Sequence, residues 1–299
     1  MNASDNHPSE ELVRKPTKMT IDYIIRQIFL GRPMRLLVLL AFMGIIVLPI
    51  FYIAMTSIKL PLEIRTSGAI FPSGGVTEIN WVKAFRNVPL VRFLFNSTVV
   101  ALFSTLLVLA VAIPATYSII RFKTGGWFLP AWIIGTYVMP PIVVSIPIFA
   151  MVKIVDLQNK LPGLILVHAM ANLPVAVWLL DSFIRNVPKE LEYAAWIDGY
   201  SKFDTLVRVV FPLIKPGVVS AAVICIILSW NEFLFALILT YSPQSNTFPI
   251  GISRYIGEHG MQFGEMSAAA LAGIIPIYLL VMLFSHNVVE GLTRGSVKG

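Results

Sequence analysis

Residues 186–216 read NVPKELEYAAWIDGYSKFDTLVRVVFPLIKP, a polar and regularly punctuated stretch in a chain that is otherwise strongly apolar. Pro188 suits the start of a helix, because its fixed φ matches the first turn and its missing N–H is not needed there. Gly199 suits the end, because glycine adopts the left-handed conformation without strain. The stretch therefore predicts a short surface helix that ends near residue 199.

A second helix start follows at once. Ser201, with Asp204 three residues later, has the form of a capping box, in which side chains satisfy the free N–H groups of the first turn. An apolar stripe at helical spacing comes next and stops at Pro212. Its members are Phe203, Leu206, Val207 and Val210. Two short helices at an angle are expected.

The composition places these helices on a membrane protein. Hydrophobic residues make up 57% of the 299 residues and charged residues only 13%, and charge-free runs recur. Several runs exceed the roughly 20 residues that a spanning helix needs. We expect an all-α membrane protein with a tail at residues 1–34 and a transmembrane domain at residues 35–299. Its six predicted spans are residues 36–58, 94–120, 127–152, 161–184, 217–241 and 266–289.

The basic residues predict the orientation. Most of the 23 Lys and Arg residues fall on the cytoplasmic side if both termini are cytoplasmic, as the positive-inside rule favours; the opposite topology is the alternative. Residues 186–216 then form a cytoplasmic loop. The net charge of +7 is scattered at helix ends and does not indicate a nucleic-acid partner. Cys225 is the sole cysteine, so this chain offers neither a disulfide nor a cysteine-rich metal site.

Catalytic motifs are absent from the sequence. It contains no G-x-S-x-G, no H-E-x-x-H and no G-x-x-x-x-G-K-[ST] phosphate loop. A chain with six spans is a candidate transporter subunit, channel or intramembrane enzyme, and the missing motifs argue against the enzyme. If nucleotide hydrolysis drives transport here, another subunit has to bind the nucleotide.

The long loop resembles a known coupling element. EYAAWIDG at residues 192–199, followed by VVFP at residues 209–212, is similar to the EAA motif E-A-A-x3-G-x9-I-x-L-P of ATP-binding-cassette (ABC) importer permeases. The spacing agrees throughout. Tyr193 stands where the family has glutamate, and Glu192 lies one residue away, about 100° around the helix. Val209 and Phe211 replace the isoleucine and leucine of the motif.

Further segments resemble the carbohydrate branch of this superfamily, and more closely the second permease subunit of maltose-type transporters. They are ANLP at residues 171–174, SWNEF at residues 229–233 and GLTRGSVKG at residues 291–299. The resemblance covers about residues 36–299. It implies the ABC type I importer permease fold with cytoplasmic coupling helices, in a bacterial or archaeal cytoplasmic (inner) membrane.

The same resemblance implies function and partners. The chain would translocate a sugar or oligosaccharide by alternating access, together with membrane lipid, a homologous second permease subunit, an ABC ATPase dimer and an extracytoplasmic solute-binding protein. It would be no enzyme and bind no cofactor, because ATP and Mg would sit on the ATPase. The alternatives are a permease for a polyol, a glycerol phosphate ester or another solute, and an ion-coupled secondary transporter. The residues implied in ATPase coupling are Glu192, Tyr193, Ala194, Ala195, Asp198, Gly199 and Pro212. In related permeases a tail such as residues 291–299 can touch the ATPase.

Polar residues inside the spans are candidates for the translocation pathway. Glu232 stands out, because a carboxylate within a span is costly unless it is paired, solvated or protonated. We group it with three polar or aromatic residues as possible pathway lining, namely Asn172, Trp230 and Asn231. The alternative is an interhelical hydrogen bond or a contact with the companion subunit.

Prolines and histidines in the spans have two interpretations each. The prolines mark either helix breaks around a cavity or kinks without function. The histidines, far apart and without ligand-spaced neighbours, favour interhelical hydrogen bonds over metal binding. These residues are Pro140, Pro141, Pro174, Pro276, His168 and His286.

Overall fold

The computed structural model describes residues 32–257 and 260–296, with side chains described from residue 34 to residue 283 except at residues 258–259. Nearly all of the predicted tail at residues 1–34 lies outside this range. So do the last three residues of the C-terminal segment and the side chain of His286.

The chain divides into two compact units, residues 1–53 and 54–299. In the first unit, the described part belongs to helix α2 (Arg32–Ser57), which occupies the first predicted span. It is long and apolar enough to cross a membrane. Pro49 lies inside α2 without ending it.

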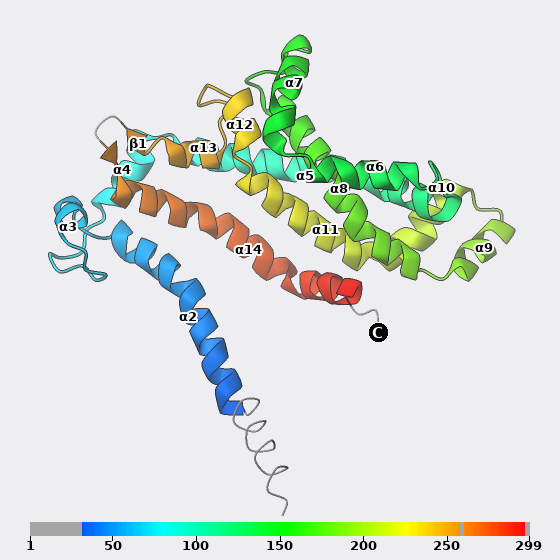
Figure 1. Ribbon diagram of the computed structural model, residues 1–299, viewed down its shortest axis with the longest axis horizontal. Coiled ribbons are helices and arrows are strands. Elements are labelled where there is room, and N and C mark those ends of the chain that lie inside the picture. The colour runs from blue at the N-terminus through cyan, green and yellow to red at the C-terminus, as the bar shows by residue number, and fades with distance from the viewer. Residues whose placement is uncertain (1–31, 258–259, 297–299) are drawn as a thin grey trace, which may run out of the picture. The chain divides into compact units, whose positions relative to one another are not determined.

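Four long helices form the body of the second unit. They are α5 (Leu90–Phe122), α8 (Leu161–Asn186), α11 (Phe211–Asn231) and α14 (Phe263–Ser296). Helix α5 packs against α8 and α11, and α11 also packs against α8 and α14 (Figure 1). All four meet the length and hydropathy of membrane spans, so the described residues contain five candidate spans with α2 included, or six if one bent helix pair counts as a span.

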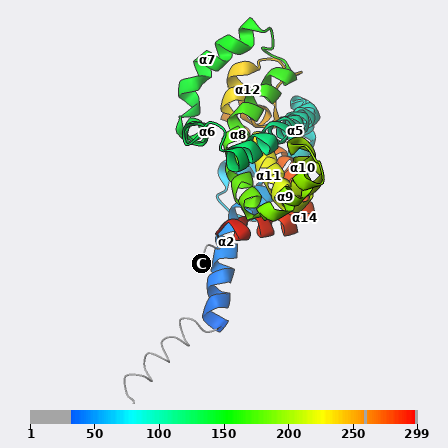
Figure 2. The same ribbon diagram turned by 90° about the vertical axis from the view of Figure 1, so that its right-hand side faces the viewer.

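The bent pair occupies the third predicted span. Helix α6 (Phe128–Val138) and helix α7 (Pro141–Ile154) meet at an angle of 101°, and α7 points away from the packed helices in both views (Figures 1 and 2). The third predicted span, residues 127–152, is thus bent at one of the proline positions that the sequence marks as a candidate helix break. The cause is the pair Pro140 and Pro141, which removes two consecutive N–H donors and disfavours helical backbone before each ring. By contrast, Pro174 in α8 and Pro276 in α14 leave their helices continuous.

The fifth predicted span is also interrupted. Helix α11 ends at Asn231, and a separate helix α12 (Leu234–Leu239) follows, so the continuous span predicted over residues 217–241 is wrong. Glu232 explains the break, because its backbone is extended and its carboxylate accepts hydrogen bonds from the first turn of α12. The bonds come from the N–H groups of Phe235 (2.9 Å) and Ala236 (3.1 Å).

Short elements gather at the two ends of the helix bundle (Figure 1). The α4 end carries α3 (Pro61–Thr66), α4 (Ile79–Asn87), α13 (Phe248–Ser253) and the strands β1 (Ile256–Gly257) and β2 (Gly260–Met261). The strands pair antiparallel, with Ile256 opposite Met261. The opposite end, the α9 end, carries α9 (Lys189–Ile197) and α10 (Lys202–Thr205).

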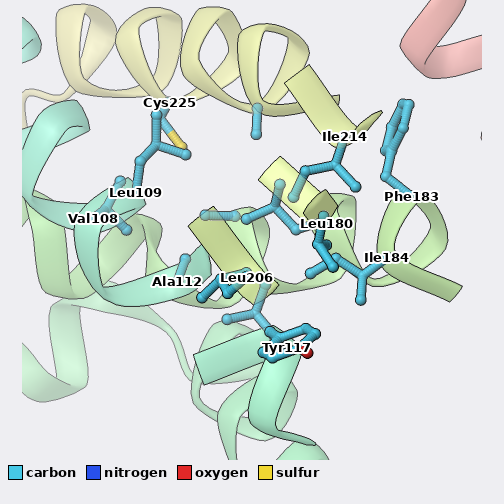
Figure 3. Packing of buried hydrophobic residues seen from close by; sticks show 14 of the residues in the cluster. Val108, Leu109, Ala112, Tyr117, Leu180, Phe183, Ile184, Leu206, Ile214 and Cys225 are labelled. Carbon is cyan, nitrogen blue, oxygen red and sulfur yellow. The ribbon is translucent and has the colours of Figure 1, made fainter. Parts of the chain in front are cut away.

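The core nearest the α9 end is apolar and tightly packed. Side chains from α5, α8 and α11 meet there (Figure 3). The labelled members are Val108, Leu109, Ala112, Tyr117, Leu180, Phe183, Ile184, Leu206, Ile214 and Cys225. Helices α8 and α11 approach closely at Gly217, where an added Cβ would lie 2.3 Å from the ring of Phe183. Cys225 is a fully buried free thiol in this core.

Candidate functional site

Helix α9 has the ends that the sequence predicts. Pro188 is its extended N-cap, and Gly199 takes φ of +87° after the last turn. The N–H of Tyr200 donates to the Ala195 carbonyl (2.9 Å) and that of Gly199 to the Trp196 carbonyl (3.1 Å), which is the Schellman pattern. Glycine is favoured at residue 199 because left-handed backbone strains residues with a Cβ.

The second helix begins as predicted but does not stop as predicted. The N–H of Asp204 donates to Ser201 Oγ (3.1 Å), which caps α10. A π-helical turn, η1 (Leu206–Val210), then leads directly into α11, so one helix runs from Lys202 to Asn231. The predicted stop at Pro212 is wrong. Proline has no N–H to donate, and its ring crowds the carbonyl four positions earlier; the wider π turn before Pro212 accommodates both effects.

This continuity changes the meaning of the apolar stripe. Leu206 and Val210 are buried in the core, whereas Phe203 and Val207 are exposed. The predicted loop at residues 186–216 is thus a short helix, a sharp turn and the first part of the fifth span.

The two faces of α9 have different surroundings. Glu192 and Ala195, three residues apart, are buried against the chain's own interior. Tyr193, Ala194 and Ile197 are on the exposed side, where Ile197 retains 86% of its accessible surface. We call these three residues the outer face of α9. Sequence reasoning missed Ile197, although an apolar residue four positions after Tyr193 fits a helical stripe.

The other residues implied in coupling lie beyond α9. Asp198 and Gly199 are exposed in the turn after the helix, and Pro212 is exposed on the first turn of α11. The outer face and this turn are therefore accessible from outside the chain, whereas Glu192 and Ala195 are not. Any effect of these two buried residues on a partner has to act through the position of α9.

A buried ion pair holds the inner side of α9. Arg121 Nε, at the end of α5, lies 2.6 Å from Glu192 Oε1, and the two side chains are 5% and 1% exposed. The Tyr117 hydroxyl donates to Glu192 Oε2 (2.9 Å). Both carboxylate oxygens are thus satisfied, as a buried charge requires. Glu192 therefore forms a salt bridge within its own chain.

Arg121 reaches a third helix as well. Its Nη2 donates to the carbonyls of Ile184 (2.8 Å) and Val187 (2.7 Å), which belong to the last turn and C-cap of α8. One guanidinium thereby joins α5, α8 and α9. Arg121 and Glu192 are 71 residues apart, so no local sequence pattern indicates this site.

Aromatic contacts surround this ion pair. The ring of Phe122 stacks on Trp196 with centroids 6.3 Å apart. Lys202 Nζ lies 4.3 Å from the centre of the Phe122 ring, a cation–π contact. The end of α5 thus touches both short helices of the α9 end.

The predicted pathway residues do not share one surface. Asn172 is buried and donates to Ser229 Oγ (2.9 Å), which lies 3.0 Å from Ser104 Oγ. These contacts connect α8, α11 and α5. Trp230 is buried against Phe248, with ring centroids 6.0 Å apart. Asn172 and Trp230 therefore pack inside this chain.

Asn231 and Glu232 lie where α11 ends. Asn231 is exposed, and its Nδ2 donates to the carbonyl of Ile227. Glu232 Oε2 lies 3.2 Å from Nε2 of His168, on α8, without the alignment of a hydrogen bond. The imidazole is 1% exposed, and neither of its nitrogens has a hydrogen-bond partner among the described residues. The break in the fifth span therefore brings a carboxylate to a buried histidine, which the sequence spacing did not indicate.

Comparisons with known proteins agree with this arrangement. The family model described as "Binding-protein-dependent transport system inner membrane component" matches residues 108–294. The sulfoquinovosyl glycerol transport system permease protein SmoH of Agrobacterium fabrum is 34% identical over 272 residues, covering 91% of this chain and 95% of SmoH. The trehalose transport system permease protein SugB of Mycobacterium tuberculosis is 33% identical over 262 residues, covering 86% and 94%.

A solved structure supports the fold. A chain of a bacterial ABC transporter involved in the import of the acidic polysaccharide alginate superposes with a TM-score of 0.71 at 17% identity, covering 91% of this chain and 98% of that chain. The extent of the family match and the identity to full-length relatives settle the family. This chain belongs to the inner membrane components of binding-protein-dependent transport systems, and it is a multi-pass permease subunit of an ABC importer.

Proposed function

We propose that this permease carries a sugar or oligosaccharide across the cytoplasmic membrane by alternating access. The relatives named for sulfoquinovosyl glycerol and trehalose transport support a carbohydrate, because their similarity extends over most of both chains. The assembly would contain a homologous second permease, an ABC ATPase dimer and an extracytoplasmic solute-binding protein. ATP and Mg would bind to the ATPase, and this chain would hold no cofactor.

The observation that carries the coupling role is the outer face of α9. A nine-residue helix is too short to be stable alone, so its position depends on the contacts of its inner side. Those contacts leave Tyr193, Ala194 and Ile197 exposed. Exposed apolar side chains at the end of a membrane protein are typical of a protein contact. We infer that this face and the turn at residues 198–199 seat in a cleft of the ATPase.

Both termini are then cytoplasmic. The α9 end has to face the cytoplasm to reach an ATPase, and the α4 end would face the solute-binding protein. Basic side chains near α9, including Arg185, Lys189 and Lys202, agree with that orientation. Cysteine-accessibility labelling from each side of the membrane tests it, with labelling of Lys189→Cys from outside as the contrary result.

For the pathway, we propose that Asn231 and Glu232 lie closest to the solute. They sit at a break between two helices, where irregular backbone in a membrane usually lines a cavity. Asn172 and Trp230 would support this break from within. Asn231→Ala is expected to raise the KM for solute uptake, and an unchanged KM would argue against this assignment.

Reconstitution tests the whole proposal. The permease is placed in vesicles with its companion permease, the ATPase and the binding protein, and uptake is measured for sugars, polyols, glycerol phosphate esters and amino acids. We expect ATP-dependent uptake of a sugar that requires the binding protein. Uptake that follows an ion gradient without ATP would support a secondary transporter and refute the proposal.

A further inference from the structure

The ion pair beneath α9 matters most for α5, a long helix that the chain does not connect directly to α9. We call α9, α10 and the turn between them, residues 189–205, the coupling turn. Helix α8 runs into α9 through residues 187–188, and α11 continues from α10 through η1, so the backbone joins both α8 and α11 to the coupling turn. Helix α5 has no such connection. It meets α9 through side-chain contacts, of which the ion pair between Arg121 and Glu192 joins two buried charges.

Few other contacts could replace this one. On the inner side of α9, Ala195 offers only a methyl group, and Trp196 stacks on Phe122 at a centroid distance of 6.3 Å. Such a stack can slide, whereas a charged pair with both carboxylate oxygens bonded has a defined geometry. The position of α9 relative to α5 is therefore set chiefly by Arg121, Tyr117 and Glu192.

Helix α5 also reaches the opposite end of the bundle. With 33 residues it is about 50 Å long at 1.5 Å per residue. Near its start, Asn96 Nδ2 donates to the carbonyls of Gln244 (3.0 Å) and Asn246 (2.8 Å). Ser97 Oγ accepts from the N–H of Phe248 (2.8 Å). Buried hydrogen bonds thus fix α5 to the segment before and into α13.

We propose that Arg121 is a positioning residue that fastens α5 to the coupling helix, so that α5 carries movement of α9 to residues 244–248 at the α4 end. This inference rests on the proposed function, because the ATPase supplies the movement. The charge of Glu192 is used inside this subunit to transmit that movement, and the outer face of α9 meets the ATPase without it.

Spin labels at the two ends test the proposal in the assembled transporter. One label is placed at Lys189→Cys on α9, and another at Val91→Cys, an exposed position on the first turn of α5. The native Cys225 is fully buried and does not compete for the reagent. In the wild-type background, we expect ATP to change the spectra of both labels.

Glu192→Gln removes the charge with little change in shape. We expect the α9 label to keep its ATP response, while the α5 response and the uptake per ATP hydrolysed both fall about tenfold, within the usual range of coupling between sites. Tyr117→Phe removes one hydrogen bond and leaves the ion pair, so it should give a smaller loss in the same direction. The matched control is Asp181→Asn, which breaks the exposed pair with Arg185 near the same end and should change neither response.

Two results would overturn the inference. An undiminished response at Val91→Cys in both Glu192→Gln and Tyr117→Phe would show that α5 follows α9 without the ion pair. Absence of an ATP response at both labels in the wild-type complex would instead refute the proposed function, and this inference with it.

Discussion

Ile197→Asp and Ala195→Asp place the same carboxylate on opposite faces of α9, and the structure predicts opposite outcomes. Ile197 is 86% exposed in this chain. Full burial of an isoleucine side chain is worth about 1.5–3 kcal/mol. Scaled by the exposed fraction, docking of Ile197 in an ATPase cleft contributes about 1.3–2.6 kcal/mol. Loss of that term weakens ATPase binding by about ten- to eightyfold.

Ala195→Asp should act on the permease itself. Ala195 is 5% exposed and lies one turn from the buried Glu192, so the new carboxylate would be buried beside a like charge. We expect a lower yield and a lower Tm of the isolated permease. Ile197→Asp should leave that Tm unchanged and reduce ATPase recovery in titrated co-purification, with Ile197→Leu as the conservative control.

The comparison can fail in two ways. If Ile197→Asp recovers the ATPase with wild-type affinity, the outer face of α9 is not the contact. If Ala195→Asp leaves the Tm of the permease unchanged, the inner face of α9 is not packed as described.

Three further outcomes follow from particular residues. Gly199→Val should cost about 1–3 kcal/mol of strain at φ of +87° and reduce ATP-driven uptake. Gly199→Asn should be milder, because asparagine adopts left-handed backbone more readily than a β-branched residue, and no other atom lies within 4 Å of an added Cβ to add crowding in either variant. Equal uptake by wild type and Gly199→Val would contradict this. Gly217→Ala should lower the Tm of the permease, because its Cβ would lie 2.3 Å from the ring of Phe183, and a matched Gly135→Ala with open space around it should not. The backbone N–H of Ser73 donates to the Glu63 carboxylate and lowers the pKa of Glu63 below its ordinary value of 4.5. The ionised carboxylate therefore stabilises the loop between α3 and α4 above pH 4.5. This stabilisation is lost as the pH falls through the lowered pKa of Glu63. Hydrogen exchange of the Ser73 amide, corrected for its intrinsic rate, should accelerate in wild type as the pH falls through the lowered pKa of Glu63. In Glu63→Gln the exchange should be fast at every pH.

Local chemistry made the ends of α9 predictable. Pro188, Gly199 and Ser201 act within one turn of their own positions, so their effects can be seen in a short window of sequence. The same holds for the location of the spans, which follows from length and hydropathy, although the breaks within the third and fifth spans do not. The coupling turn and most of the membrane helices could therefore be located before any tertiary contact was known.

Partners distant in sequence were not predictable. Arg121 and Glu192 are 71 residues apart, and a nine-residue helix with mixed polarity does not show which side faces inward. Glu232 and His168 are a similar case, since their approach depends on the break between α11 and α12. The 100° offset between Glu192 and Tyr193 correctly separated two faces, but only the structure assigned one face to the interior.

The prolines show that neighbouring residues decide whether a proline ends a helix or is tolerated within it. Pro174 sits inside α8 and Pro140 ends α6, although both lie in predicted spans. A single proline removes one hydrogen bond, which a packed helix tolerates, whereas adjacent prolines remove two and restrict the residues before them. Pro212 is tolerated for a third reason, the π turn that precedes it.

That π turn also sets a rotational phase. One additional residue per turn at η1 (Leu206–Val210) rotates everything after it by about 100° relative to an uninterrupted α-helix. The azimuth at which Ser229 and Asn231 project from the fifth span is therefore fixed by the winding of a segment at the α9 end of the bundle. A one-residue deletion within residues 206–210 would let this segment wind as α-helix and leave Ser229 and Asn231 at the same azimuth, whereas rewinding the π turn without a deletion would rotate both by about 100°.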